Sequence, residues 1–492
     1  MFAISRRRLI GTAAASAVLS AIPVAWGAEL PKKWDETYDV VIVGSGFAGM
    51  AAAAQALTEG ATVTVLEKMP VPGGNSAIAG GGFACWTDKE HRREKLGLGE
   101  DSAERHKSDT IKGGDFFNLP ELVNVVVEGA PDAMNWMLDE GGLVLNKGLG
   151  RVGGHTAYRD HMASGARYLD ALTKIAKAHG FKGVRTRHEA VRLWKDEKTN
   201  TILGVEVKAR SKTINIRAKK AVIMAAGGFG HDVEFRMSQV PTLNAAYNTT
   251  NHAGATAQAL KMTMAAGASA MHLAFIQLFP TAEPGTGRID RPSLFPIQFP
   301  GFGAVYVSNK GRRFVSELER RDVVAQAELA TGDKNTWCVF NGEVFAKLTD
   351  KAEMDKFVAT GRLKTGETVA DLAKAMGVPA DALEKTVAEH NEFIRSKKDT
   401  QFGKPITPAM APMTQGPYYA VAQWPSVHHC QGGVRINPKA QVIDVEGNVI
   451  RHLYAAGEFT GGVHGNNRLG GNAIADCIVF GRVAGKNASS EK

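Results

Sequence analysis

Arg468 is the residue whose type and surroundings most clearly indicate chemistry in this chain. It lies within residues 455–474, a run richer in glycine than ordinary turns require. Its guanidinium offers a planar fork of N–H donors that matches a carboxylate. Gly470 and Gly471 follow it, and their backbone N–H groups can approach a flat ligand closely because glycine has no side chain. The run therefore predicts a site that holds an anion beside a flat ligand.

A dinucleotide-binding pattern lies near the other end of the chain. Residues 38–43 predict a buried strand that leads into Gly44-Ser45-Gly46-Phe47-Ala48-Gly49, and residues 50–57 predict a helix. A second strand over 62–66 ends on Glu67, 18 residues after Gly49. In such a βαβ unit the glycines permit a tight turn, the helix N-terminus faces the pyrophosphate and the acid binds the ribose hydroxyls. The pattern alone leaves NAD and FAD as alternatives.

Together the two segments resemble the fumarate reductase flavoprotein family, especially its soluble periplasmic branch. Residues 72–82, residues 225–230 and Glu458 match further places where this family contacts FAD, so the resemblance implies FAD. Membrane-bound relatives carry a histidine that bonds covalently to the flavin, and Asn75 in its place implies noncovalent FAD. The implied cofactor-binding residues are Gly44, Gly46, Ala48, Gly49, Glu67, Lys68, Gly74, Asn75, Ser76, Gly81, Gly82, Ala226, Gly227, Gly228, Gly457, Glu458, Arg468, Gly471, Asn472, Ala473 and Ile474.

The resemblance also implies a reaction. In this family hydride passes from reduced flavin N5 to one alkene carbon of an unsaturated acid, and an arginine gives a proton to the other carbon. Residues 309–322 resemble the stretch with that arginine, which makes Arg321 the proton donor. His429 and Arg468 resemble the carboxylate clamp, although either His428 or His429 could face the substrate, and Gly471 would add a backbone donor. Because an arginine normally keeps its proton, the role requires a group that reprotonates it.

The expected second carboxylate site departs from the family. Where fumarate reductases have His-Pro-Thr, this chain has Phe279-Pro280-Thr281, and residues 296–300 are apolar where charge is expected. A carboxylate buried there without a partner would be unfavourable, whereas an apolar group would gain from burial. We therefore expect a small unsaturated monocarboxylate such as methacrylate or acrylate. A bulkier aryl acrylate, urocanate or cinnamate, is an alternative, and so is fumarate if Thr281, Glu283 and Arg288 rebuild the site. A non-reducing flavoprotein dehydrogenase is a more distant one.

The pattern of elements predicts an α/β fold in two parts. Strands and helices alternate over 36–273 and again over 426–487, which predicts a Rossmann-like FAD-binding domain. Residues 274–425 are less regular and contain two proline clusters. By resemblance they form an α+β capping domain that interrupts the FAD-binding domain and closes over the substrate.

The N-terminus and the composition predict where the protein works. Arg6, Arg7 and Arg8 precede a short apolar stretch, which indicates a twin-arginine signal peptide over 1–28 and a periplasmic protein without an integral membrane segment. The formal net charge of +9 becomes 9 − 3 = +6 after its removal, without the basic clusters of a nucleic-acid binder. No Cys-x-x-Cys-His haem motif and no metal site is present in the sequence. By resemblance, electrons would arrive from a separate periplasmic multihaem cytochrome c.

Overall fold

The computed structural model describes residues 29–347 and 350–492. The predicted signal peptide lies outside these residues. The largest sheet has eight strands, and its centre is β1 (Glu36–Val43), which pairs in parallel with β2 (Val63–Glu67) and β9 (Lys212–Met224). The last four residues of β1 are buried valine and isoleucine, as expected for a parallel strand covered on both faces. The other strands are β6 (Val184–Thr186), β7 (His188–Asp196), β8 (Thr201–Ala209), β17 (Gln441–Ile443) and β18 (Val449–Ala455). This arrangement confirms the predicted α/β fold class.

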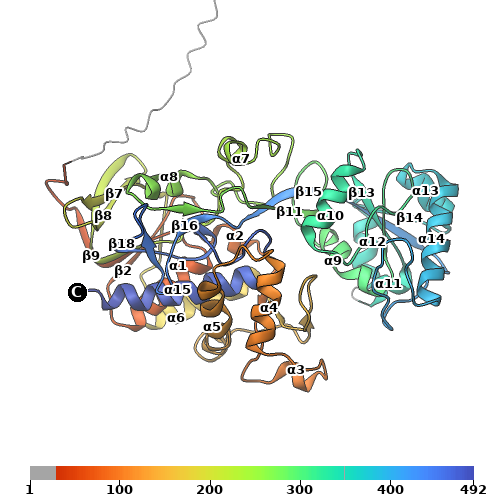
Figure 1. The fold of residues 1–492 in the computed structure, drawn as a ribbon, viewed down its shortest axis with the longest axis horizontal. Helices are drawn as coiled ribbons and strands as arrows, with labels where there is room; N and C mark the ends of the chain where they lie inside the picture. Colours follow the sequence, from red (N-terminus) through yellow and green to blue (C-terminus); the bar gives the residue numbers. More distant parts are fainter. Residues whose placement is uncertain (1–28, 348–349) are drawn as a thin grey trace, which may run out of the picture.

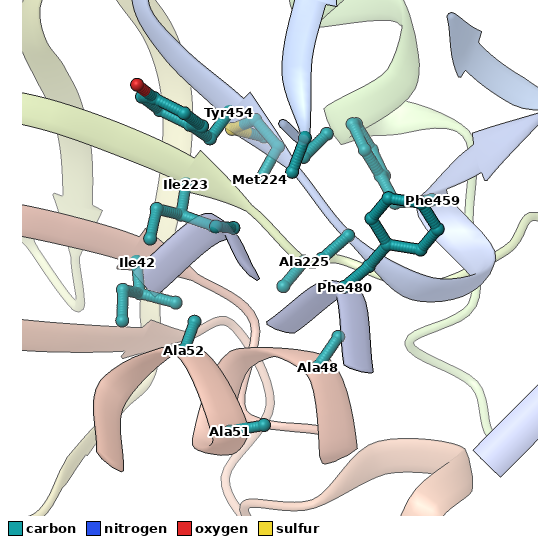
Figure 2. Close-up of a cluster of buried hydrophobic side chains, with 14 of the residues drawn as sticks. Ile42, Ala48, Ala51, Ala52, Ile223, Met224, Ala225, Tyr454, Phe459 and Phe480 are labelled. Atoms are coloured by element: carbon teal, nitrogen blue, oxygen red, sulfur yellow. The ribbon is translucent and has the colours of Figure 1, made fainter. Parts of the chain in front are cut away.

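Two helices from opposite ends of the chain cover one face of this sheet (Figure 1). Helix α1 (Phe47–Thr58) packs against α15 (Asn472–Ser490). A Cβ atom on Gly481 would lie 2.5 Å from the Ala48 carbonyl oxygen, so only glycine permits this approach. Figure 2 shows how Ile42, Ile223, Phe480 and their neighbours from the sheet and the two helices form one core.

Smaller elements complete this part of the molecule. Two three-stranded sheets are formed by β3 (Gly82–Ala84), β4 (Leu149–Gly150) and β5 (Asp160–Met162), and by β10 (Ala270–Met271), β16 (Gly433–Arg435) and β19 (Thr460–Gly461). The helices are α2 (Gly74–Ala77), α3 (Arg92–Lys95), α4 (Ala103–Gly113), α5 (Pro120–Asp139), α6 (Gly165–Ala178), α7 (Val233–Gln239), α8 (Gln258–Ala265) and η3 (Gly457–Phe459).

A second hydrophobic core lies beside the first, on the right in Figure 1. Its antiparallel sheet contains β11 (Ile276–Ala282), β12 (Val305–Val307), β13 (Thr336–Asn341), β14 (Leu363–Gly366) and β15 (Tyr418–Cys430). The surrounding helices are η1 (Pro292–Leu294), α9 (Phe295–Gln298), η2 (Phe299–Phe302), α10 (Arg321–Ala330), α11 (Gly342–Ala346), α12 (Lys351–Ala359), α13 (Val369–Met376) and α14 (Ala380–Arg395). Phe295 stacks on Phe299 in this core, with ring centroids 4.8 Å apart. We keep the name capping domain for residues 274–425, and its limits stay a prediction.

Strand β15 links the two cores. Its residues Tyr418–Gln423 pair with β13 inside the capping domain. Its residues Trp424–Cys430 pair with β11 and carry the His428-His429 pair toward the FAD-binding domain. One continuous strand therefore positions both a capping sheet and a part of the predicted substrate site.

A buried ion cluster holds the capping domain together. Arg313 pairs with Glu317 and with Asp399, both at 2.9 Å, and Lys404 lies 3.1 Å from Glu317. Burial alone would raise the pKa of Glu317, but Lys404 and Arg313 lower it to about 2.

Across residues 29–347 and 350–492, no helix is long and apolar enough to span a membrane.

Candidate active site

A cavity lies where the carboxyl ends of β1 and β2 meet the N-terminus of α1. Most of the predicted cofactor residues line it: Gly44, Gly46, Ala48, Glu67, Lys68, Gly74, Asn75, Ser76, Ala226, Gly227, Gly228 and Glu458. They come from five separate stretches of sequence, which the parallel sheet brings to one edge. Ligands of doubly wound sheets bind at this edge.

The glycine loop is shaped by backbone contacts that exclude side chains. Gly44 has φ +111°, and a Cβ atom on it would lie 2.1 Å from the Ala225 carbonyl oxygen. A Cβ atom on Gly49 would lie 2.0 Å from the Gly44 carbonyl oxygen. Gly49 therefore supports the turn from inside and does not line the cavity. Gly74 and Gly227 also have positive φ but face open space.

The acidic residue at the end of β2 is held in place by its neighbours. Glu67 accepts hydrogen bonds from the Ser45 hydroxyl at 2.7 Å and from the Met69 N–H at 2.9 Å. Lys68 donates to the Thr256 hydroxyl at 2.6 Å. A fixed carboxylate at this position suits the hydroxyl groups of a ribose.

The remaining predicted cofactor residues lie outside this cavity. Gly81 and Gly82 lie at the start of β3, Gly457 begins η3, Arg468 and Gly471 lie in the loop before α15, and Ala473 and Ile474 lie in its first turn. Asn472 turns its side chain toward α4, where it contacts the His106 ring nitrogen at 2.9 Å and the Thr110 hydroxyl at 3.0 Å.

The sequence pattern did not predict several of the residues that line the cavity. His188 and Glu189 line the cavity from β7, Thr256 from the turn before α8, and Gln258 from the first residue of α8. Neither segment carries a glycine motif, so only the fold shows that they meet the glycine loop.

Arg468 is buried and belongs to a second group of polar side chains. Its Nη2 donates to the Gln277 side-chain oxygen at 2.9 Å, and its Nη1 donates to the Leu469 carbonyl oxygen at 3.1 Å. Its Nε is buried without a partner among the described residues. Burial and the charge of Arg321 lower the pKa of Arg468 to about 9. Two guanidinium groups held so close together favour an anion between them.

Arg321 begins α10 on the capping domain, and its guanidinium lies 5.1 Å from the centre of the Phe279 ring. The side chain donates no hydrogen bond within the described part of the chain. Arg321 is partly accessible to solvent, yet the surrounding protein desolvates it and lowers its pKa to about 10, against the opposing charge of Asp160. A guanidinium with a lowered pKa releases its proton more readily.

The two histidines of β15 have different surroundings. His428 contacts the Thr250 hydroxyl at 2.7 Å and packs 5.0 Å from the Phe279 ring centre. His429 is buried, and its Nδ1 has no partner among residues 29–347 and 350–492. Burial and the charge of Arg468 hold the pKa of His429 well below its usual value, so its ring is neutral. Its unused nitrogen makes His429 the better candidate for a ligand contact.

Comparison with known proteins decides between the two cofactors. A family model described as an FAD binding domain matches residues 39–474. The chain is 37% identical over 459 residues to a fumarate reductase (cytochrome) of Shewanella frigidimarina, with 92% of this chain and 77% of that protein covered. The chain belongs to the fumarate reductase family of FAD-binding flavoproteins. Its predicted cofactor, FAD, is thereby confirmed, whereas noncovalent attachment stays a prediction.

Two further relatives of this flavoprotein extend the comparison. An acrylate reductase flavoprotein subunit of Shewanella woodyi is 35% identical over 505 residues, with 98% of both chains covered. The solved open conformation of a flavocytochrome c3 fumarate reductase superposes with a TM-score of 0.76 at 36% identity, over 93% of this chain and 78% of that chain.

The cavity of the flavoprotein fits an FAD. The glycine turn and the α1 N-terminus would face the pyrophosphate, and Glu67 would bind the ribose of the adenosine half. Burial raises the pKa of Glu458 to about 7. The hydrogen bond that its side chain accepts from the Cys430 N–H at 2.9 Å opposes this shift. A carboxyl group with a pKa near 7 can donate or accept a hydrogen bond, which suits the hydroxyl groups of the FAD ribityl chain.

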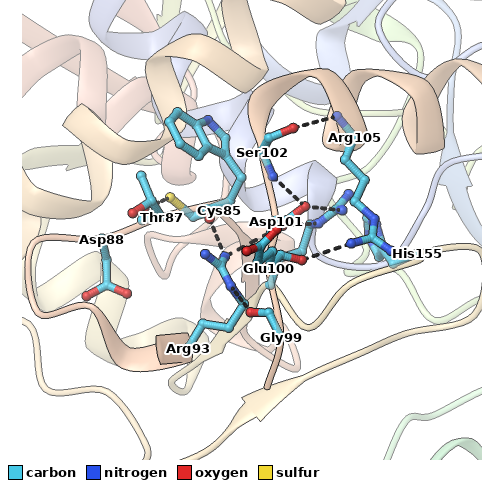
Figure 3. Close-up of polar contacts among 12 residues, drawn as sticks. Cys85, Thr87, Asp88, Arg93, Gly99, Glu100, Asp101, Ser102, Arg105 and His155 are labelled. Carbon is cyan, nitrogen blue, oxygen red and sulfur yellow. Dashed lines mark hydrogen bonds and ion pairs between the residues drawn. The ribbon is translucent and has the colours of Figure 1, made fainter. Parts of the chain in front are cut away.

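A buried network supports the Arg468 loop of the flavoprotein from behind. Arg159 donates to the Asp101 carboxylate at 2.8 and 2.9 Å and to His155 Nδ1 at 3.2 Å. Because arginine only donates, His155 must carry its proton on Nε2, which lies 2.8 Å from the Gly470 carbonyl oxygen. Burial and Arg159 lower the pKa of His155 to about 4 and keep this tautomer neutral. Figure 3 shows His155 beside Asp101 and Arg105 in this network.

The predicted polar alternatives for a second carboxylate site have other partners. The buried Thr281 hydroxyl donates to the Ser293 carbonyl oxygen at 2.8 Å. Glu283 accepts from the Thr286 hydroxyl at 2.6 Å, and Arg288 is exposed. Pro296 is buried against the capping core, where its carbonyl oxygen accepts a hydrogen bond from the Tyr306 hydroxyl at 2.5 Å.

Proposed function

We propose that this flavoprotein reduces the C=C bond of a small α,β-unsaturated monocarboxylate, with methacrylate or acrylate as the favoured substrate. The reaction adds a hydride to one alkene carbon and a proton to the other. Bound FAD supplies the hydride after it has received two electrons. The observation that carries the proposal is a site with anion-binding groups at one end and the Phe279 ring at the other.

The anion-binding end is assigned to Arg468 and His429. Both side chains are buried, and Arg468 Nε and His429 Nδ1 are buried nitrogens without a partner among the described residues. Buried polar atoms in native proteins nearly always have a partner, so these two point to a ligand. A carboxylate would accept from them and lose electron density, which activates the conjugated carbon toward hydride.

The other end favours an apolar substituent. Phe279 is buried and contacts both Arg321 and His428. Thr281 and Glu283 are hydrogen-bonded elsewhere, and Arg288 is exposed. A second carboxylate against the phenyl ring would lose its water, and pairing with Arg321 would divert the group assigned as the acid.

Arg321 is assigned as the acid. The lowered pKa of about 10 and the lack of a hydrogen-bonded partner in the described chain leave its N–H groups available to a substrate carbon. Its place at the start of α10 lets movement of the capping domain bring it to the substrate.

Fumarate is the second candidate, supported by the relative named for that activity. It requires the capping domain to supply a partner for the distal carboxylate, and Arg321, 5.1 Å from the Phe279 ring centre, is a candidate. Aryl acrylates such as urocanate or cinnamate require Phe279 to stack on the ring. A non-reducing dehydrogenase is disfavoured, since a neutral substrate does not need paired guanidinium groups.

We further infer a periplasmic protein that receives electrons from a separate multihaem cytochrome c. The twin-arginine pattern at residues 6–8 supports export. The full-length similarity to a protein named a flavoprotein subunit supports a partner as well. FAD that binds without a covalent bond, as Asn75 suggests, would have to be loaded before export of the folded protein.

The test is an anaerobic turnover assay. The FAD-loaded protein is reduced with a viologen dye, and dye reoxidation is followed after addition of acrylate, methacrylate, fumarate, urocanate or cinnamate. The proposal predicts the highest kcat/KM with acrylate or methacrylate. Turnover with fumarate alone would overturn the monocarboxylate assignment, and no turnover with any acid would overturn the proposed reaction.

A further inference from the structure

Asp160 is a buried carboxyl group that the sequence did not single out. It begins β5, the middle strand between β3 and β4, and its exposed fraction is 0%. The preceding residue, Arg159, points into the Asp101–His155 network. Because neighbouring residues of a strand point to opposite faces, Asp160 points the other way, toward the glycines after Arg468. A Cβ atom on Gly471 would lie 1.9 Å from Asp160 Oδ1.

The hydrogen bonding of Asp160 is incomplete. Its Oδ2 accepts from the Val152 N–H at 3.2 Å. Its Oδ1 is buried and has no partner in the described parts of the chain. An ionised carboxylate that is structural would be expected to have both oxygens satisfied. This oxygen instead lies beside Gly471, in the loop that follows Arg468, where it is free to make a further hydrogen bond.

The charges around Asp160 come from three elements. Arg159 precedes it in the chain, and the positive charges of Arg321 on α10 and of Arg468 in the loop before α15 also act on it. The Tyr168 hydroxyl on α6 is a further ionisable neighbour and donates to the His161 carbonyl oxygen. Burial raises the pKa of Asp160 to about 7 although the three cations oppose it. The group can therefore hold or release a proton near neutral pH.

Asp160 is in turn an acidic neighbour of Arg321. Asp160 is the charge that raises the pKa of Arg321 against the effect of burial. No ion pair of 4.0 Å or less joins the two side chains, so a bridging water or a small movement of α10 would connect them.

We propose that Asp160 is the proton-holding group that recharges Arg321 after each turnover. This inference rests on the proposed function, in which Arg321 gives its proton to the substrate carbon. The neutral guanidine then takes the proton of the Asp160 carboxylic acid, an N–H bond forms and the O–H bond breaks. The Asp160 carboxylate regains a proton from solvent. No electrons move in this step.

The first test separates the first turnover from later ones. The Asp160→Asn variant is loaded with FAD, reduced and mixed with acrylate. Its first turnover should keep the wild-type rate, because Arg321 starts with its own proton. Steady-state turnover should fall about tenfold to a hundredfold, within the range of general acid–base effects. The wild-type decline of kcat above pH about 7 should disappear in Asp160→Asn and return in Asp160→Glu.

Asp109→Asn is the matched control. Asp109 lies 3.0 Å from Arg159 on the other side of β5, so this variant removes a buried carboxylate of the same region without facing the clamp. It should keep the wild-type pH profile even if it lowers the melting temperature. Equal losses of first and later turnovers in Asp160→Asn, or an unchanged pH profile, would overturn the proposal.

The second test does not depend on turnover. Carbon-13 NMR of the FAD-loaded protein, labelled at the aspartate carboxyl carbon, should show one resonance that titrates near pH 7 and is missing in Asp160→Asn. In Arg321→Met its midpoint should move to higher pH, because a cation that stabilises the carboxylate has been removed. An unmoved midpoint would overturn the coupling even if no acid in the turnover panel proves to be a substrate.

Discussion

The side-chain oxygen of Gln277 accepts a hydrogen bond from Nη2 of Arg468 at 2.9 Å, while its amide nitrogen donates to the Arg468 carbonyl oxygen at 2.9 Å and to Asn467 at 2.6 Å. Strand β11 thereby fixes the guanidinium without neutralising it. A neutral partner leaves the positive charge of Arg468 for a ligand, which a glutamate at the same place would not.

Replacing Gln277 with Glu should weaken substrate binding. The new carboxylate would compete with the substrate for Arg468, so we expect KM for acrylate to rise about tenfold or more, on the scale of a charged hydrogen bond. Steady-state kinetics with the viologen assay measure this change. Gln415→Glu, at an exposed position, adds the same charge elsewhere and should leave KM unchanged. An unchanged KM in Gln277→Glu would remove Arg468 from the clamp.

Replacing Arg321 with Met should abolish turnover and leave the cofactor bound. Methionine keeps much of the length of the side chain but cannot supply a proton, so kcat should fall at least about 10²-fold. The flavin absorbance of the purified protein reports FAD content, which should match the wild type. Arg312→Met removes an exposed arginine from the same segment and serves as the control. Substantial activity in Arg321→Met would assign the acid to another group.

Replacing Phe279 with His should shift the substrate preference toward fumarate. A ring nitrogen could donate to the distal carboxylate, which the phenyl ring cannot, so the ratio of kcat/KM for fumarate to that for acrylate should rise about tenfold. Phe279→Leu keeps an apolar surface and should keep the wild-type preference. If both variants prefer the same acids as the wild type, Phe279 does not line the substrate site.

Two glycines with similar backbone angles should respond differently to alanine. Gly44 has φ +111° and no room for a Cβ atom beside Ala225, whereas Gly60 has φ +80° and open space around it. Gly44→Ala should lose FAD and lower the melting temperature strongly. Gly60→Ala should cost only about 1 kcal/mol from backbone strain and keep FAD. Retained FAD in Gly44→Ala would mean that the glycine turn can relax.

Acid should destabilise the capping domain through Glu317. Its pKa is about 2 in the folded protein and 4.5 in the reference state, so its stabilising contribution is complete above pH 4.5 and is lost as the pH falls toward 2. Urea unfolding at a series of pH values measures this loss. Glu317→Gln should weaken the protein at pH 7 by about 3–5 kcal/mol, because Arg313 and Lys404 keep their buried charges, and should flatten the acid dependence. An unaltered acid dependence would assign it to other groups.

Local patterns predicted the elements around the cofactor well. The expected strand over 38–43, the helix over 50–57 and the second strand over 62–66 correspond to β1, α1 and β2 with small differences at their ends. Alternating hydrophobicity and glycine spacing are properties of consecutive residues, so they can be recognised without a fold.

Contacts between distant segments could not be predicted in this way. Gln277 and Asp160 carry no motif, and their importance depends on β11 and β5 lying beside the Arg468 loop. Asn472 belonged to a predicted cofactor segment, but its side chain contacts α4 instead. A resemblance assigns positions to a site, whereas the direction of each side chain follows from packing that the sequence does not display.

The pairing of α1 with α15 also constrains the order of events during synthesis. The glycine turn emerges from the ribosome among the first residues, but Glu458 and the helix that packs on α1 come last. A nascent chain therefore cannot complete the cofactor cavity, and its alanine-rich first helix must wait for a partner. The FAD cavity is complete only once Glu458 has joined the glycine turn, so bound FAD would report that these distant segments have come together.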